Sequence, residues 1–576
     1  MAGNSFRQCP SSGLYFHRSA ESLMKAHAVM AVVFFLIGGI FGLLVMLTRM
    51  PSVHLLSAEA FYMALSIHGT DILIFWIIFF EIAVLYFASS TLLRVRPAMP
   101  QLGWLGFILM LAGSVTTTLS FFRGNSSVMF TSYVPMPAEP IFYLGLILFA
   151  VGALVGCFLF LGTLVIAKRE KTYEGSIPLV TFGALTACII AILTIVMGAI
   201  ILIPTLLWSM GYIAEIDPLV YRTIWWGLGH SSQQINVSAQ VAIWYAIAAI
   251  VFGAKPMSEK VSRGAFLLYI LFLQLASAHH LLVDPGLSTS WKVFNTSYAM
   301  YLAVLASMVH GLTVPGSIEV AQRKKGFTNG LFEWLRKAPW DNPVFSGMFL
   351  AMIIFGFIGG ITGVVMGTEQ INLIIHNTIF VPGHFHATVA VGTTLTFMAI
   401  TYFLIPVLFR RELILPKLAK IQPYLFAGGM LMLILFMLGA GTLGVPRRHW
   451  DVSFSDAVMK FQFAGTAITM LGMAGVGGIL AALGGAAYCL IAVGSLVFGK
   501  RLDDNASLFS SFGFPMAAPA YKVDQPDRLA MTPVESHGSE PHAAPGTFAL
   551  ALVFLATFVV YFFINAKYLS SLWHMS

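Results

Sequence analysis

The sequence predicts an all-α fold, a polytopic membrane bundle with about 13 transmembrane helices. Of the 576 residues, 58% are hydrophobic and only 10% are charged. Apolar runs of about 20 residues, the length that crosses the hydrocarbon core of a bilayer as a helix, recur along the whole chain. A water-soluble globular domain is excluded, because it does not contain so many long apolar runs.

The apolar runs place the expected spans and the segments between them. The twelfth span is long enough to be two short segments, divided near Gly475 and Gly478. A tail (1–25) precedes a twelve-span core (26–499), which is followed by a polar loop (500–545) and a last segment with the final helix and the C-terminus (546–576). The spans cover about residues 26–48, 59–90, 102–122, 140–167, 177–208, 219–253, 265–283, 293–320, 345–368, 377–407, 423–444, 462–499 and 546–566.

Positive charges are distributed unevenly between the two sets of loops. Thirteen spans place 24 of the 32 lysines and arginines on the side of the N-terminus and 8 on the other side. Because loops rich in Lys and Arg stay in the cytoplasm, the N-terminal tail and the 500–545 loop are predicted to be cytoplasmic. The net charge of +8 therefore indicates topology, and no nucleic-acid partner is expected. The tail lacks the short apolar segment of a signal peptide.

The cysteines are scattered singly along the chain and form no CxxC motif or disulfide framework. A copper site built from paired cysteines would therefore have to lie on another chain. The four are Cys9, Cys157, Cys188 and Cys489.

Six histidines are predicted to share one layer of the membrane. Each lies within about a dozen residues of the outer end of its span, which at about 1.5 Å per residue is the outer third of the bilayer. Ionisable residues inside a membrane are costly and usually functional, and neutral imidazole is a common metal ligand. A lone histidine is as easily a packing residue, but six at one depth indicate metal or haem ligation. They are His68, His230, His279, His280, His384 and His386.

The adjacent pair His279 and His280 predicts a metal centre. Neighbours on a helix are about 100° apart, so both side chains can turn toward one ion. His230 can supply a third nitrogen from the neighbouring span. Three imidazoles that leave one coordination position open are typical of a catalytic metal.

His384 and His386 predict two separate haems. Two residues apart, they lie about 200° apart around a helix and face opposite ways. They therefore cannot share one metal, but each can bind a haem on its own side of the span. His68 is then available as the second axial ligand of one of these haems.

Several motifs resemble the catalytic subunit of the haem–copper oxidase superfamily, and most closely its B-type branch, which also carries thirteen spans. They are "HHLLVDPG" (279–286), "HNTIFVPGHFH" (376–386) and "VPRRHW" (445–450), and weaker similarity covers nearly the whole chain. The resemblance implies an oxidoreductase of a prokaryotic respiratory chain, in the inner membrane, that reduces a diatomic gas at a haem–copper pair. Electrons would arrive through a low-spin haem from a partner subunit II that contains copper or a cytochrome, supplied by cytochrome c or a cupredoxin.

The resemblance also implies a role for each histidine. His68 and His386 would ligate a six-coordinate, low-spin haem, and His384 would be the protein ligand of a high-spin haem. The copper ion facing that haem, preferred here over non-haem iron, would be held by His230, His279 and His280. The residues implied at or near the haem propionates are Arg447, Arg448, His376 and Asn372; guanidinium groups suit carboxylates of this kind.

Position 234 departs from the family pattern. Oxygen reductases of this superfamily usually carry a tyrosine four residues after the first copper histidine, one helical turn away. That tyrosine supplies an electron and a proton for O–O cleavage. This sequence has Gln234 there, and an amide side chain can give up neither.

No tyrosine takes over from the neighbouring positions. In another branch the tyrosine lies about one and a half turns before the His pair, where this chain has Leu273 and Gln274. Tyr269 is about 15 Å along the helix axis from His279. Tyr245 lies farther still from the metal site.

A copper site without a redox tyrosine suits two-electron chemistry. Joining two NO molecules into N2O and water takes two electrons and two protons. The sequence therefore favours NO reduction, with Gln234 as a catalytic hydrogen-bond donor to the reacting oxygen; alternatively, Gln234 only orients a copper ligand or packs. Cytochrome-c- and quinol-dependent NO reductases hold non-haem iron with extra glutamates, and residues 231–237 contain none. The alternative activity is a terminal oxygen reductase, like cytochrome c oxidase subunit I.

Reduction of either gas consumes protons, which need a polar path through the membrane. Tyr245, Ser258 and Ser238 match or neighbour the single proton path of the B-type branch. Glu81, deep in the second span, and His310, in the middle of the eighth, are further candidates. Their alternatives are a helix–helix hydrogen bond for Glu81 and packing for His310.

Two other classes of protein are weaker interpretations. A haem-binding transporter or sensor without turnover does not need the adjacent His pair at an open site. A secondary transporter would show an internal repeat and helices broken near mid-membrane, and the sequence indicates neither.

Overall fold

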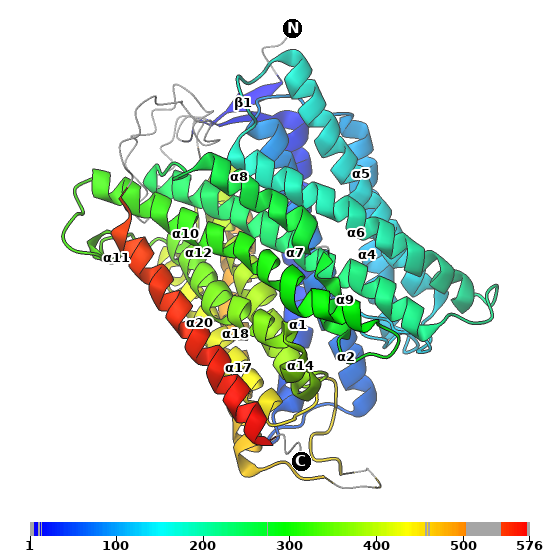
Figure 1. Ribbon diagram of the computed structural model, residues 1–576. Coiled ribbons are helices and arrows are strands. Elements are labelled where there is room, and N and C mark those ends of the chain that lie inside the picture. Colours follow the sequence, from blue (N-terminus) through cyan, green and yellow to red (C-terminus); the bar gives the residue numbers. More distant parts are fainter. Residues whose placement is uncertain are drawn as a thin grey trace.

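The computed structural model describes residues 5–9, 12, 14–273, 275–455, 458, 461–502 and 543–572. Within these ranges, 12 helices are long and apolar enough to cross a membrane, which confirms the predicted all-helical, polytopic class. The two ends of the chain lie at opposite ends of the helix bundle (Figure 1). A chain that crosses a membrane an odd number of times has its two ends on opposite sides. The crossing that is added to these 12 helices is a broken segment after α7.

Six of the long helices come from the first half of the chain. The second of them is a continuous run in which π-helical turns join α-helical segments. The six are α1 (Arg18–Arg49); α2 (Ala58–Thr70) with η1 (Asp71–Trp76), α3 (Ile77–Tyr86) and η2 (Phe87–Thr91); α4 (Pro100–Phe122); α5 (Pro140–Glu170); α6 (Leu179–Ser209); and α7 (Pro218–Phe252).

The other six follow the broken segment, with the short helices α11 (Glu333–Arg336) and α14 (Glu369–Ile375) in their connections. They are α9 (Thr289–Phe294) with η5 (Asn295–Ala299) and α10 (Met300–Lys324); α12 (Pro343–Ile354) with η6 (Phe355–Gly360) and α13 (Ile361–Gly367); α15 (Phe380–Phe385) with η7 (His386–Thr393), α16 (Thr394–Leu404) and η8 (Ile405–Phe409); α17 (Pro416–Thr442); α18 (Gly465–Phe498); and α20 (Pro545–Leu572).

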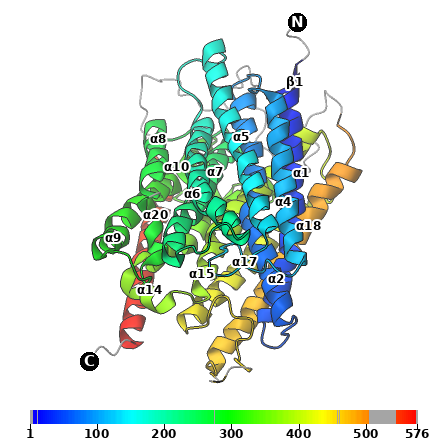
Figure 2. The same ribbon diagram turned by 90° about the vertical axis from the view of Figure 1, so that its right-hand side faces the viewer.

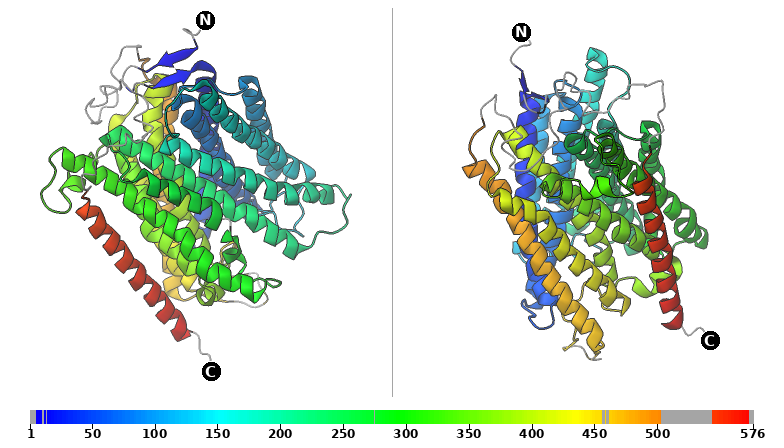
Figure 3. Two further views of the ribbon diagram at one scale, coloured as in Figure 1. Left: turned by 45° about the horizontal axis from the view of Figure 1, so that its top comes forward. Right: turned by 90° about the vertical axis from the view of Figure 1, so that its left-hand side faces the viewer.

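Helix α7 is the central element of the bundle. Asp217 starts it by accepting hydrogen bonds from the backbone N–H groups of Leu219 at 2.7 Å and Val220 at 3.2 Å. Gly253 ends it with a φ of +66°, a conformation that glycine adopts without strain. Its most apolar 18-residue stretch is 100% buried, against 6% for α20, which lies on the outside of the bundle (Figures 2 and 3).

The predicted seventh span is not one regular helix. It consists of α8 (Glu259–Leu268), the π-helical turn η3 (Tyr269–Leu273) and the 3-10 turn η4 (Ser277–Leu281), and Gln274 lies outside the described residues. Ser262 Oγ lies 3.0 Å from Tyr245 Oη near the end of α7, and His280 Nε2 lies 3.2 Å from His230 Nδ1 near its start. The segment therefore runs antiparallel to α7 and makes the thirteenth crossing.

The start of the first helix also differs from the expectation. Residues 18–25 belong to α1 and not to the tail, because Glu21 forms ion pairs with Arg7 at 2.9 Å and Lys25 at 2.7 Å. The tail before it holds a hairpin of β1 (Phe6–Gln8) and β2 (Tyr15–His17). The predicted 500–545 loop falls mostly outside the described residues.

The twelfth predicted span is one helix, α18, despite its glycines. A Cβ on Gly477 would lie 2.4 Å from the backbone nitrogen of Leu433, and one on Gly484 would lie 2.6 Å from that of Phe426. These glycines therefore allow α17 to approach closely and do not divide the span.

Glu319 of α10 fixes the start of α20. Its carboxylate accepts hydrogen bonds from the backbone N–H groups of Gly546 at 2.9 Å and Thr547 at 2.6 Å, and from Arg323 Nε at 2.7 Å. An acid at a helix N-terminus is favourable because the first N–H groups have no partner within the helix. The rest of α20 is largely exposed, so this contact is its main polar anchor.

Replacing Glu319 with Leu leaves two N–H groups without their acceptor and removes the ion-pair partner of Arg323, whose guanidinium is half-buried. We expect the protein to lose about 3 kcal/mol of stability, the scale for breaking a buried ion pair. Thermal unfolding of the detergent-purified protein measures the loss. The matched control is Glu174→Leu at an exposed position in the loop between α5 and α6, where we expect little change in melting temperature; equal shifts for both variants would contradict the assignment.

Candidate functional site

The six predicted histidines all line one cavity of about 510 Å³ in the centre of the bundle. Helix α2 carries one of them, α7 another, η4 the adjacent pair, and the junction of α15 and η7 the last two. The described lining is otherwise mainly apolar, with three arginines at one end of the cavity. The arrangement brings together every side chain that the sequence singled out as a metal or haem ligand.

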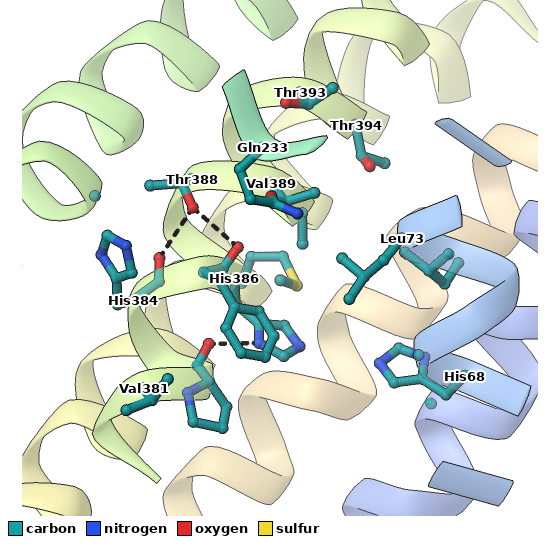
Figure 4. A pocket seen from close by; sticks show the side chains of 18 of the residues that line it. His68, Leu73, Gln233, Val381, His384, His386, Thr388, Val389, Thr393 and Thr394 are labelled. Carbon is teal, nitrogen blue, oxygen red and sulfur yellow. Dashed lines mark hydrogen bonds between the residues drawn. The ribbon is translucent and has the colours of Figure 1, made fainter. Parts of the chain in front are cut away.

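His68 and His386 have the geometry of two axial ligands of one haem. Their rings face each other with centroids 6.3 Å apart and planes 21° apart. Two imidazoles bound to opposite faces of one metal ion, with bonds of about 2 Å, have ring centres about 6 Å apart. Figure 4 shows the two side chains facing each other across the cavity, so these residues fit a six-coordinate haem.

Each haem-ligand candidate has one ring nitrogen held by a second group. Nδ1 of His68 lies 2.8 Å from the Gly38 carbonyl, and Nδ1 of His386 lies 2.7 Å from the Pro382 carbonyl. Nδ1 of His384 lies 2.9 Å from the Thr362 hydroxyl. Such second partners fix the ring orientation and leave Nε2 as the ligand atom. The three imidazoles are therefore oriented as ligands and not as packing residues.

His384 lies on the other side of its helix from His386 (Figure 4). A Cβ on Gly363 would come within 3.1 Å of its Cε1, so the glycine makes room for this ring. Since His384 and His386 point to different sides, they fit two separate haems, as their spacing predicts.

His230, His279 and His280 form the one group of three or more His, Cys, Asp or Glu in the described part of the chain that could hold a metal ion. Their ligand atoms all lie within 4.8 Å of one another. His230 Nδ1 and His280 Nε2 are 3.2 Å apart, and the ring of Trp226 stacks on His280 with centroids 3.8 Å apart. Three imidazoles at this separation fit one copper ion with an open position.

Gln234 lies directly beside this triad. Its Nε2 is 3.1 Å from Nε2 of His230, the ring nitrogen opposite to the one that faces His280. With Nδ1 on a metal, Nε2 of His230 is the nitrogen that faces the amide. Gln234 is thus placed to orient a metal ligand, and its side chain also lines the cavity.

The described lining of the cavity contains no tyrosine, aspartate or glutamate. The hydroxyls of Tyr269 and Ser307 share a hydrogen bond, with oxygens 3.1 Å apart, and Ser307 lines the cavity while Tyr269 does not. Tyr245 is also absent from the lining. An oxidisable phenol beside the copper ligands is therefore missing among the described residues.

Three arginines close one end of the cavity, and the sequence analysis missed Arg49. Arg447, Arg448 and Arg49 line it, and neither Arg447 nor Arg448 forms an ion pair with a described acid. Burial and the neighbouring Arg448 lower the pKa of Arg447 to about 9, and burial lowers that of Arg448. Two adjacent half-buried cations that form no ion pair with a described acid fit a bound dianion such as haem propionates.

His376 and Asn372 do not line the cavity. Burial, and then the charge of Arg447, lower the pKa of His376 to about 4, so it is neutral at neutral pH. Asn372 donates its amide to the Met366 carbonyl at 2.7 Å. His376 and Asn372 therefore lie near the arginine end of the cavity but outside its lining.

An ion pair near the arginine end was not anticipated. Arg222 binds Asp284 through two hydrogen bonds of 2.9 and 3.1 Å, and its guanidinium stacks 4.6 Å above the ring of Tyr133. Asp284 belongs to the "HHLLVDPG" motif, so the motif could have identified it as a residue near the site. The pair ties the metal-binding segment to α7.

Tyr245 is the centre of a polar cluster between α7, α8 and α10. Its hydroxyl lies 3.0 Å from Ser262 Oγ, 3.0 Å from His310 Nδ1 and 2.6 Å from Thr313 Oγ1. The structure thus joins two of the predicted proton-path residues and adds two that were missed. The spacing of Ser307, His310, Thr313 and Ser317 along α10 could have shown Thr313, because it places all four on one face.

Two other proton-path candidates lie outside this cluster. Ser238 donates to the Gly183 carbonyl at 2.9 Å, and Ser258 caps α8 by accepting from the N–H of Val261 at 3.4 Å. Both hydroxyls have local structural partners. That they carry protons stays a prediction, and the structure adds Ser262 and Thr313 as hydroxyls in contact with Tyr245.

Comparison with known proteins agrees with the geometry. A family model described as "Cytochrome C and Quinol oxidase polypeptide I" matches residues 22–489. Cytochrome c oxidase subunit 1 of Thermus thermophilus is 33% identical over 407 residues, which cover 69% of this chain and 71% of the relative. Quinol oxidase subunit 1 of Bacillus subtilis is 22% identical over 458 residues, covering 76% and 67%.

The fold agrees as well. A cryo-EM structure of a heme-copper terminal oxidase dimer superposes with a TM-score of 0.80 at 26% identity, covering 95% of this chain and 92% of the other. The relatives are named for oxidases, and no finding in these comparisons is specific for NO reduction. They support the oxygen-reductase alternative of the sequence analysis better than its preferred activity. Together with the six converging imidazoles, they show that this multi-pass membrane chain belongs to the haem–copper oxidase subunit I family.

Proposed function

We propose that this chain reduces nitric oxide to nitrous oxide at the site formed by the six histidines. The observation that carries the proposal is Gln234, which lies 3.1 Å from a copper-ligand imidazole where family oxygen reductases carry a tyrosine. When bound, the haem iron and copper would supply electrons and hold the gas. The reaction takes two NO, two electrons and two protons and gives N2O and water, so it needs no electron from a side chain.

The residues around the metal site have distinct roles in this proposal. The low-spin haem would be held by His68 and His386, and the high-spin haem by His384. Gln234 would donate an amide hydrogen bond to the oxygen that leaves as water, an interaction that strengthens as negative charge develops. The apolar cavity wall would keep bulk water away, which strengthens that hydrogen bond.

Oxygen reduction is the second candidate, and the names of the relatives favour it. Cleavage of O2 to water takes four electrons, and the metals and haems of such a site must then supply them without a nearby phenol. Both candidates share the ligands, the protons and an electron-donating subunit II, with soluble cytochrome c or a cupredoxin as the source. They differ in what position 234 must do.

We further propose that protons reach the cavity along α10. The cluster around Tyr245 connects Ser262 and Thr313 to His310 Nδ1, and the ring of Tyr269 packs 5.5 Å from that of His310. The hydroxyl of Tyr269 in turn meets Ser307 on the cavity wall. Hydroxyl and imidazole groups can pass a proton by donating on one side while accepting on the other, and a water between His310 Nε2, which has no partner among the described residues, and the Tyr269 hydroxyl would complete the path.

Turnover with each gas decides between the two candidates. We expect the purified, fully reduced enzyme, assembled with its haems and copper, to consume NO at least about ten times faster than O2. Gas electrodes measure both rates on the same preparation, and gas chromatography measures the N2O formed. Rapid O2 consumption with negligible NO consumption would establish the oxygen-reductase alternative.

Replacing Gln234 with Leu tests the amide. We expect NO turnover to fall by about 10²-fold, the effect of removing one donor to a developing oxyanion, while copper content stays at one per pair of haems. The conservative Gln234→Asn variant retains an amide donor on a shorter side chain and should keep more activity. Loss of copper in parallel with activity would show that Gln234 only orients His230.

Replacing Tyr245 with Phe removes the hydroxyl that three groups share. We expect steady-state turnover with either gas to fall by about 10²-fold, because proton delivery becomes limiting. The haem absorption spectra should not change. The matched control is Tyr298→Phe, which alters an exposed tyrosine; the same loss in both variants would contradict a proton path through Tyr245.

A further inference from the structure

A second cavity adjoins the catalytic cavity. It has a volume of about 150 Å³ and lies between α3, α5, α6 and α7. Leu73, Phe130, Gly229 and Gln233 line both cavities, so these side chains form the wall between them. A buried water needs about 10–15 Å³ of such space, so the second cavity has room for several.

Glu81 is the only carboxyl group in the described lining of this second cavity. It is 6% exposed, and it forms no ion pair with any described residue. A carboxylate buried in a membrane bundle without a counter-ion is very costly. Glu81 therefore carries its proton when the site is at rest, unlike Glu319, which is paired with Arg323.

Asn236 of α7 contacts this carboxyl group directly. With its amide nitrogen facing its two oxygen neighbours, Asn236 donates to Glu81 Oε1 at 2.9 Å and to the Ser232 carbonyl at 3.2 Å. Because Oε1 accepts, the proton of Glu81 sits on the other oxygen. The same amide donor would stabilise the carboxylate once that proton has left.

The groups that face Glu81 from the neighbouring helices leave the proton few other partners. Cys157 of α5 and Cys188 of α6 line the same cavity, and Cys188 donates to the Cys157 carbonyl at 3.5 Å. His27 of α1 packs against Phe79 and so lies on a different side of α3. The thiols are weak donors and acceptors, so neither competes strongly for the proton.

Gln233 connects the second cavity to the catalytic one. Its Oε1 is buried and has no hydrogen-bond partner among the described residues, and its Nε2 donates to Ser232 Oγ at 3.4 Å. Figure 4 shows its side chain among the residues around His386 and Val389. An unsatisfied buried carbonyl is costly, and it is well placed to hold a water that enters between the cavities.

We propose that Glu81 donates protons to the catalytic cavity through water in the second cavity and past Gln233. The O–H bond of the Glu81 carboxyl breaks, and its proton adds to the oxygen atom that gas reduction releases as water. Glu81 then takes a proton back from the aqueous phase. This inference rests on the proposed gas reduction, but it applies to NO and O2 alike, since both yield water.

Infrared difference spectroscopy of the holoenzyme tests the donor itself. The reduced-minus-oxidised spectrum should contain a carboxylic C=O band that shifts in D2O and is absent from Glu81→Gln. Glutamine keeps the size of the side chain and an acceptor for Asn236, so the haem spectra and copper content should not change. A band that persists unchanged in Glu81→Gln would overturn the proposal.

Turnover gives the second readout. We expect Glu81→Gln to lower the rate with whichever gas the enzyme reduces by about 10²-fold, the scale for loss of a general acid, and Glu81→Asp to restore part of it. Full activity in Glu81→Gln would also overturn the proposal. Failure of the wild-type enzyme to reduce NO would refute only the proposed substrate, because the infrared band does not depend on the gas.

Discussion

The bundle is organised around the cost of placing six imidazoles in the interior of a membrane protein. A protonated imidazole there would have to be desolvated, so each ring is neutral and needs partners for both nitrogens. Backbone carbonyls or a hydroxyl hold one nitrogen of His68, His384 and His386. The other nitrogen needs a metal, and this requirement brings segments from four parts of the chain to one cavity.

Helix α7 shows how this requirement shapes the fold. It carries one ligand of the triad, the amide beside it and, farther along, Tyr245 and Asn236, and its most apolar stretch is completely buried. The segment that supplies His279 and His280 abandons regular helix at η3 and η4. Adjacent residues in a π-helical or a 3-10 turn can both point toward α7. The geometry of the metal site, and not the apolar pattern, therefore determines the backbone conformation of this segment.

The ligand set could be predicted because helical geometry converts residue spacing into direction. His384 and His386 are two residues apart, which places them on opposite faces of a helix. All six histidines were expected at one depth, and the structure places them around one cavity. The broken seventh span and the Tyr245 cluster could not be predicted, because both depend on contacts between helices far apart in the sequence. Ser238 and Ser258 are further examples: the Ser238 hydroxyl donates to the Gly183 carbonyl of α6, and that of Ser258 accepts from the Val261 N–H at the start of α8.

The fold and the ligands identify the metals, but they say little about the gas. Relatives at 33% identity share the bundle and are named for oxidases, whereas the choice of gas depends on how many electrons the site delivers at once. That number changes with one side chain beside a copper ligand, because a phenol can be oxidised and an amide cannot. Position 234, whose side chain lies 3.1 Å from His230, is therefore where the proposed NO reduction and the oxygen-reductase alternative differ within one and the same fold.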